Sequence, residues 1–218
     1  MNLGKACVAE FIGTFALVFL GCAGVVAAGN AGTGPIIPAF AHGLAIVFAA
    51  YALGHWSGAH INPAVTISVL IAGGIDIGKA AAYIVTQIVA AIAAAAALNL
   101  ILNGQAANFG AFSFGPAVTT SDAFLLEAIL TFFLATVVLQ AAVAGKAGNF
   151  AGLAIGLTLA GCILAGGAIT GASLNPARTL GPAIIAGQMG QVWVYVAATV
   201  TGGVLAALVS RFVLADQS

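Results

Sequence analysis

Charged residues are scarce in this sequence. Asp, Glu, Lys and Arg together make up 5% of it, and the formal net charge at pH 7 is zero. A water-soluble domain carries about 25% charged residues, because it needs them to cover its surface. The composition therefore excludes a soluble globular domain. The lack of excess charge also gives no basis for binding nucleic acid or another polyanion.

Cysteine is scarce as well. The three cysteines, Cys7, Cys22 and Cys162, lie in apolar segments, and an odd number there argues against a disulfide framework. No stretch of the sequence has the spacing of a metal site, a phosphate-binding loop, or a nucleophile with its base. We expect no metal, no cofactor and no enzymatic activity.

Apolar residues, in contrast, make up 62% of the sequence. They fall into six long stretches, near residues 7–28, 38–56, 80–102, 123–144, 150–168 and 191–213. Each is close to the ~20 residues that an α-helix needs to cross a bilayer. Uniform hydrophobicity does not fit a membrane β-barrel, whose strands alternate apolar and polar residues. The sequence predicts an all-α membrane protein with six transmembrane helices.

An Asn-Pro-Ala triplet occurs twice, each time after a loop of small residues. Asn is a favoured helix N-cap and Pro a favoured first helical residue, so each triplet predicts an abrupt helix start. The helix after the first triplet is about a dozen residues long, roughly 15–18 Å, against a hydrocarbon core of about 30 Å. Each such helix is half a span. The triplets are Asn62-Pro63-Ala64 and Asn175-Pro176-Ala177.

The two triplets occupy matching places in an internal repeat. Glu10 in the first apolar stretch is echoed by Glu127 in the fourth, and each half runs span, span, half-helix, span. Three full crossings per half place the halves upside down relative to one another. We expect a single channel domain over 1–218, with inverted repeats over about 1–103 and 121–213, whose half-helices meet tip to tip at the midplane.

The few basic residues predict the orientation. If the N-terminus is cytoplasmic, Lys5, Lys79, Lys146 and Arg211 all lie inside, and the outer loops at 28–37 and 103–121 contain no Lys or Arg. This is the positive-inside pattern, and it places both termini in the cytoplasm. Arg178 alone departs from it, and it follows the second triplet directly.

The paired loops resemble those of the aquaporin (major intrinsic protein) family, and the resemblance covers essentially the whole chain. The matching segments read Ser-Gly-Ala-His-Ile-Asn-Pro-Ala-Val-Thr and Asn-Pro-Ala-Arg-Thr-Leu-Gly-Pro-Ala. The resemblance implies six transmembrane helices plus two reentrant half-helices. It also implies a homotetramer in the lipid bilayer with one pore per subunit.

A mechanism can be argued from the same residues. If the side-chain oxygens of Asn62 and Asn175 cap their helices, the amide N–H groups are free to donate to water in the lumen. Water turned in this way breaks a proton wire, and the positive helix ends oppose an excess proton. Backbone carbonyls would line the two approaches to the midplane, namely those of Gly58, Ala59, His60, Gly171, Ala172 and Ser173.

The resemblance also implies a selectivity filter of His42, Ile163, Ala172 and Arg178. Orthodox water channels have Phe at the first of these positions and His at the second, so this set looks closer to plant tonoplast intrinsic proteins. An apolar wall makes ammonia, hydrogen peroxide or urea plausible secondary permeants. Glycerol is less favoured, because the glycerol branch usually has Asp where this chain has Thr179.

Glu10 and Glu127 leave two interpretations open. A carboxyl inside a membrane is a functional hypothesis by default, and a proton relay would indicate an ion-coupled transporter. Alternatively, each carboxyl accepts hydrogen bonds from a loop and holds a half-helix in place, which the symmetric placement favours. We expect a passive water channel, with a channel for small neutral solutes as the alternative. Short loops and termini predict a prokaryotic cytoplasmic (inner) membrane.

Overall fold

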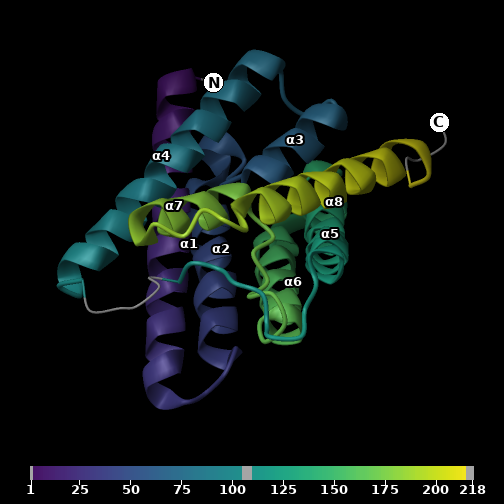
Figure 1. Cartoon of the computed structure of the whole chain (residues 1–218). Coiled ribbons are helices and arrows are strands. Elements are labelled where there is room, and N and C mark those ends of the chain that lie inside the picture. The colour runs from purple at the N-terminus through teal and green to yellow at the C-terminus, as the bar shows by residue number, and fades with distance from the viewer. Residues whose placement is uncertain (1, 105–109, 215–218) are drawn as a thin grey trace.

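A computed structural model describes residues 2–104 and 110–214, and within them the secondary structure is helical, with no strand (Figure 1). Six helical segments are long and apolar enough to cross a membrane, as the sequence predicts. The long helices are α1 (Leu3–Ala31), α2 (Ile36–Ser57), α4 (Ile77–Ile101), α5 (Thr120–Val137), α6 (Ala151–Gly166) and α8 (Val192–Phe212). A π-helical turn, η1 (Val138–Val143), extends α5, and a 3₁₀ turn, η2 (Gly148–Phe150), precedes α6.

Two short helices begin at the predicted positions. They are α3 (Pro63–Ile71) and α7 (Pro176–Ala186). Asn62 Oδ1 accepts a hydrogen bond of 2.9 Å from Ala64 N, and Asn175 Oδ1 accepts one of 2.9 Å from Ala177 N. Their lengths of 9 and 11 residues correspond to about 14–17 Å, which is half of a bilayer core.

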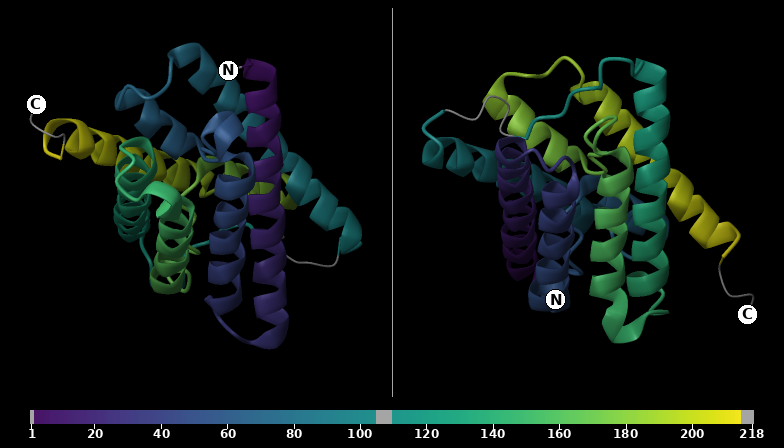
Figure 2. Two further views of the ribbon diagram at one scale, coloured as in Figure 1. Left: turned by 180° about the vertical axis from the view of Figure 1, so that it is seen from behind. Right: turned by 90° about the horizontal axis from the view of Figure 1, so that it is seen from below.

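The two halves of the chain use equivalent helix contacts. Helix α1 packs against α4 in the first half, and α5 packs against α8 in the second. Each half-helix crosses to the opposite half, so that α3 lies against α8 and α7 against α4. Figures 1 and 2 show α4 and α8 running obliquely across the bundle, with the two half-helices beside them. This exchange brings the two triplets together in the interior.

Glycines allow α2 and α6 to approach closely. A methyl group on Gly43 would lie 2.6 Å from the Gly156 carbonyl oxygen, and one on Gly156 would lie 2.6 Å from the Gly43 oxygen. A methyl group on Gly152 would lie 2.8 Å from Ala50 Cβ. Gly54 of α2, in contrast, is not at a close helix contact, because a methyl group there would have no described atom within 4 Å.

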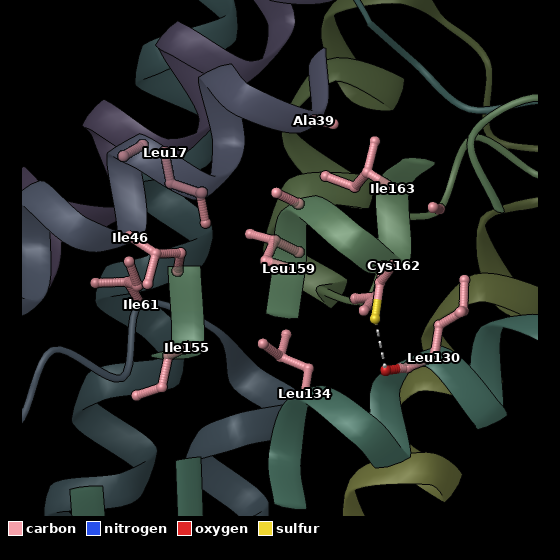
Figure 3. Packing of buried hydrophobic residues seen from close by; sticks show 14 of the residues in the cluster. Leu17, Ala39, Ile46, Ile61, Leu130, Leu134, Ile155, Leu159, Cys162 and Ile163 are labelled. Atoms are coloured by element: carbon pink, nitrogen blue, oxygen red, sulfur yellow. Dashed lines mark hydrogen bonds between the residues drawn. The ribbon is translucent and has the colours of Figure 1, made fainter. Parts of the chain in front are cut away.

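The apolar core runs through the middle of the bundle. Figure 3 shows Ile155 and Leu159 of α6 beside Leu134 of α5, with Ile46 of α2 and Ile61 of the first loop nearby. All of them are buried to at least nine-tenths. The core therefore joins both halves and reaches the loop that carries the first triplet.

Candidate functional site

The two triplets are tied to one another at their tips. Asn62 Nδ2 donates to Leu174 O at 2.8 Å, and Asn175 Nδ2 donates to Ile61 O at 2.9 Å. The expectation that both N–H groups of each amide are free is therefore wrong for one of them. A buried N–H without an acceptor is costly, and the opposing loop offers a carbonyl within reach.

Glu10 holds the first loop in place. Its carboxyl oxygens accept hydrogen bonds from His60 N at 2.8 Å, from Ile61 N at 2.6 Å and from Gln87 Nε2 at 2.8 Å. The side chain is fully buried. Backbone donors of the loop thus converge on one carboxyl of α1.

Glu127 has the equivalent place in the second half. It accepts from Thr170 Oγ1 at 2.7 Å, from Ser173 N at 3.0 Å and from Leu174 N at 3.1 Å, and it is also fully buried. Because loop donors surround both carboxyls, the contacts favour the structural interpretation of the two Glu residues over a proton relay.

Two tyrosines each bind the carbonyl of the residue just before a loop glycine, Gly58 or Gly171. Tyr83 OH donates to Ser57 O at 2.9 Å, and Tyr195 OH donates to Thr170 O at 2.6 Å. The sequence shows only that Tyr83 and Tyr195 occupy equivalent positions in the two repeats, and it does not show what they contact. The structure gives them one equivalent contact in each half.

The loops have an unusual backbone. Gly58 and Gly171 both have φ of 89°, and the alanines after them, Ala59 and Ala172, have φ of 47° and 54°. Left-handed conformations of non-glycine residues are uncommon and cost free energy, so they indicate a constraint from the surroundings. Here the constraint is the convergence of the loop N–H groups on the buried carboxyls.

A cavity lies at each end of this region. The cavity on the predicted cytoplasmic side, named the inner cavity, has a volume of about 400 Å³ and is lined by Gly58, Ala59, His60 and Asn62, together with residues of α2, η1 and α6. The cavity on the opposite side, named the outer cavity, has a volume of about 800 Å³ and is lined by Gly171 together with residues of α1, α2, α6 and the segment 110–116. Ser173 is buried and does not line either cavity.

Arg178 and His42 are in direct contact. Arg178 Nε donates to His42 Nε2 at 2.8 Å, and Arg178 Nη1 donates to Gly110 O at 2.7 Å. Because a guanidinium can only donate, His42 Nε2 must be an acceptor. The ring proton is then on Nδ1, which lies 2.8 Å from Pro38 O, and the imidazole is neutral. Arg178 is 1% exposed, and its Nη2 has no hydrogen-bond partner among the residues that the structure describes.

Ile163 and Ala172 lie in the large apolar cluster of the core, where Figure 3 labels Ile163. Ile163 also lines the outer cavity, next to Pro38 and Gly110. The structure therefore brings Arg178 and His42 into contact and places Ile163 on the outer cavity, whose lining does not include Arg178, His42 or Ala172.

Two residues of this site carry no signal in the sequence. Gly110 supplies the carbonyl for Arg178 across 68 positions of the chain. Phe112 places its ring centroid 4.2 Å from the guanidinium carbon of Arg178. Both belong to the loop predicted over 103–121, of which residues 105–109 are outside the described part of the chain. Only a tertiary contact distinguishes them from other residues of that loop.

The described residues contain no group of three or more His, Cys, Asp or Glu that could hold a metal ion. Cys7, Cys22 and Cys162 are all free thiols.

Comparisons with known proteins identify the family of the chain. The family model described as Major intrinsic protein matches residues 1–210. Glycerol uptake facilitator protein-like 6 of Lactiplantibacillus plantarum is 44% identical over 211 residues, which cover 93% of this chain and 95% of that protein. Aquaporin Z of Rhodopseudomonas palustris is 39% identical over 226 residues, with coverage of 97% and 93%.

A solved structure is also similar. The X-ray structure of the aquaglyceroporin from Plasmodium falciparum matches with a TM-score of 0.83 at 27% identity, covering 98% of this chain and 97% of that one. The chain is thus an integral membrane protein with six spans and not an enzyme. It belongs to the major intrinsic protein family, and it is a channel for water or small neutral solutes.

Proposed function

We propose that the chain is a passive channel whose main permeant is water, and that it excludes protons and ions. The observation that carries this proposal is the reciprocal contact of Asn62 and Asn175 at the tips of α3 and α7. It places two helix N-termini, each with partial positive charge, against one another.

The second N–H group of each amide donates to the oxygen of a passing water. That water then points its hydrogens away from the midplane, toward the loop carbonyls on either side. A chain of water molecules cannot keep one donor direction through this point, so a proton is not relayed. The opposed helix dipoles add an electrostatic barrier to any cation.

Arg178 acts at the outer constriction. Its charge repels cations, and its unpartnered Nη2 offers a donor to a permeating molecule. His42 accepts from Arg178 with one ring nitrogen and contacts Pro38 O with the other, so it orients the guanidinium. Ile163 and Ala172 complete the filter as its apolar side.

The loops supply the remaining polar lining. Carbonyls of Gly58, Ala59, His60 and Gly171, residues that line the two cavities, accept from water on the two sides of the midplane. The same role for the buried Ser173 stays a prediction. Glu10 and Glu127 are structural, because each binds the N–H groups that turn these carbonyls toward the lumen.

Small neutral solutes are the second candidate. The apolar Ile163 at the outer cavity favours them, since it adds no donor that a solute must satisfy. Of the two relatives, one is named for glycerol uptake and the other is named an aquaporin. Urea, ammonia and hydrogen peroxide fit this filter, and glycerol fits it less well. The similarity of the filter to that of tonoplast intrinsic proteins stays a prediction.

The proposal includes assembly and location. We infer a single channel domain over 1–218 with inverted repeats over about 1–103 and 121–213. We also infer a homotetramer with one pore per subunit, in a prokaryotic cytoplasmic membrane with both termini inside. The relation of equivalent helix pairs in the two halves supports the repeat.

Stopped-flow light scattering on proteoliposomes tests the permeant. Vesicles are challenged with sucrose, with urea and with an ammonium gradient, and wild type is compared with Ile163→His. Fast shrinkage in sucrose with little solute uptake supports a water channel. Rapid urea or ammonia uptake that Ile163→His suppresses would make neutral solutes the main permeants instead. Vesicles that shrink no faster than empty liposomes would contradict the water proposal.

A further inference from the structure

We infer that Gln140 of the π-helical turn η1 is a positioning residue of the inner mouth, the part of the inner cavity that residues 138–149 line. Its hydrogen bond to Ser210 of α8 holds η1 back from the cavity and thereby sets the rate of permeation without setting the selectivity. The inference rests on the proposed function, because it assigns the contact that keeps the cytoplasmic end of the same pathway open.

The segment 138–149 forms one wall of the inner cavity. Most of its lining residues are small: they are Val138, Ala141, Ala142, Gly145, Gly148 and Asn149. Gly145 and Gly148 have φ of 70° and 50°, and a methyl group on either would meet no described atom within 4 Å. Because the side chains of this wall are so small, the width of the inner mouth depends on where the backbone lies.

The backbone of this wall departs from an α-helix. Ala144 N donates to Leu139 O at 2.8 Å, which is the five-residue spacing of a π-helix. The register that aligns Glu127 with Glu10 aligns η1 with residues 21–26 of α1, and α1 is α-helical throughout. The repeat therefore does not require a π-turn. Such turns are rare and frequently lie at functional sites.

The side chain of Gln140 joins this turn to α8. Its Nε2 donates to Ser210 Oγ at 2.7 Å, across 70 positions of the chain. Its backbone carbonyl accepts from Lys146 N at 3.1 Å, so the same residue also closes the turn that follows η1. Among the described residues, neither Gln140 nor any residue of α8 lines the inner cavity. The bond to Ser210 therefore holds η1 from the side that faces away from the cavity.

The other end of the wall is held by α2. Tyr51 OH donates to Asn149 O at 2.7 Å, so the wall lies between one hydrogen bond to α8 and another to α2. If only the bond to α8 is lost, the wall stays attached at Asn149 and η1 can move toward the cavity. The inner cavity measures about 400 Å³, against about 800 Å³ for the outer one, so it has less room to lose.

Loss of this bond has an effect that general loosening of the channel would not have. A channel loosened at its centre admits larger solutes, and its permeability ratio of urea to water rises. A narrower inner mouth lowers the water permeability of each channel and cannot raise that ratio. The two measurements together therefore separate a positioning role of Gln140 from a merely structural one.

The test measures water permeability per channel by stopped-flow light scattering on proteoliposomes of Ser210→Ala. We expect a fall of about two- to fivefold, in line with the loss of one hydrogen bond, and no rise in the ratio of urea to water. Gln140→Leu removes the same bond from the other side and should give the same fall. The double variant should be no slower than either single variant, because both remove one interaction.

Two further variants are controls. Ser210→Thr keeps the hydroxyl and should restore the wild-type rate. Thr201→Ala removes another hydroxyl of α8, which donates to Ala197 O within that helix, and should leave the rate unchanged. Hydrogen exchange of the backbone N–H groups of residues 138–149 needs no permeant, and we expect it to be faster in Ser210→Ala than in wild type.

Wild-type water permeability in both Ser210→Ala and Gln140→Leu would overturn the proposal, whatever the exchange rates are. So would an equal fall in Thr201→Ala, a higher ratio of urea to water, or unchanged exchange in Ser210→Ala. Failure of the water proposal is a different result, in which wild-type vesicles shrink no faster than empty ones. The same variants are then compared by urea uptake, since every permeant passes the inner mouth, and equal uptake by all of them would overturn the inference.

Discussion

Two buried carboxyls are the notable single residues of this channel. Glu10 and Glu127 each sit inside the membrane and bind loop N–H groups. Each carboxyl accepts from backbone N–H groups of two loop residues, and a buried N–H without an acceptor is costly. The two residues thus hold a backbone conformation that the loops would not adopt on their own.

Glu10→Gln tests this at the residue scale. Gln keeps one acceptor oxygen but turns an NH₂ group toward donors of the first loop, so two N–H groups compete for one oxygen. We expect the free energy of unfolding to fall by about 1–3 kcal/mol. Thermal unfolding in detergent micelles measures the change.

Asp122→Asn is the control for that variant. Asp122 is exposed and accepts from Thr119 N at 3.0 Å at the start of α5, so we expect a smaller loss of stability than in Glu10→Gln. Unchanged stability of Glu10→Gln together with a loss of transport would instead support a role of the carboxyl in transport.

Local chemistry explains which elements the sequence predicts well. The starts of α3 and α7 depend on a cap and a proline that are adjacent in the sequence, so both were predictable. The long helices follow from apolar stretches of membrane length. Helix α1 begins earlier than predicted, at Leu3, because Asn2 Oδ1 accepts from Gly4 N at 2.9 Å and caps it.

Contacts between distant segments explain what the sequence does not predict. The motifs predict that Asn62, Asn175 and Arg178 belong to the site. They do not predict that each Asn amide donates one N–H to a carbonyl of the opposing loop. Gly110 and Phe112 reach Arg178 from a loop without a motif. Tertiary packing also decides which glycines lie at a close contact between helices, and the hydrophobic pattern of the sequence does not show this.

Paired glycine variants test the packing of α2 against α6. Gly43→Ala places a methyl group against the Gly156 oxygen and should separate the helices at a cost of about 1–3 kcal/mol. Gly54→Ala meets no atom within 4 Å and should stabilise α2 by up to about 1 kcal/mol. Thermal unfolding of both variants shows whether each substitution lowers or raises the stability. Equal shifts in the same direction would contradict the close approach at Gly43.

A passive channel should respond to osmotic gradients alone. We expect water flux at the whole-molecule scale to be the same with and without a proton or sodium gradient, because the midplane breaks the water wire. A pH-sensitive dye inside the proteoliposomes should report proton entry no faster than in empty liposomes. Flux that disappears when the gradient is removed would indicate an ion-coupled transporter.

Assembly is the second property of the whole molecule. A homotetramer has a protein mass of about 85 kDa, four times the 21.3 kDa of one chain. Native mass spectrometry from detergent micelles measures it directly. A dominant species at the mass of one chain under gentle activation would contradict the tetramer.

The reciprocal bonds between the two triplets set an order of events during synthesis. The acceptor for the Asn62 amide is the carbonyl of Leu174, 112 residues later in the chain. Until the ribosome has made that residue, the first loop lacks the partner that completes it. The pore centre is therefore finished in one late step, and a nascent chain stopped before Leu174 contains helices but no assembled channel.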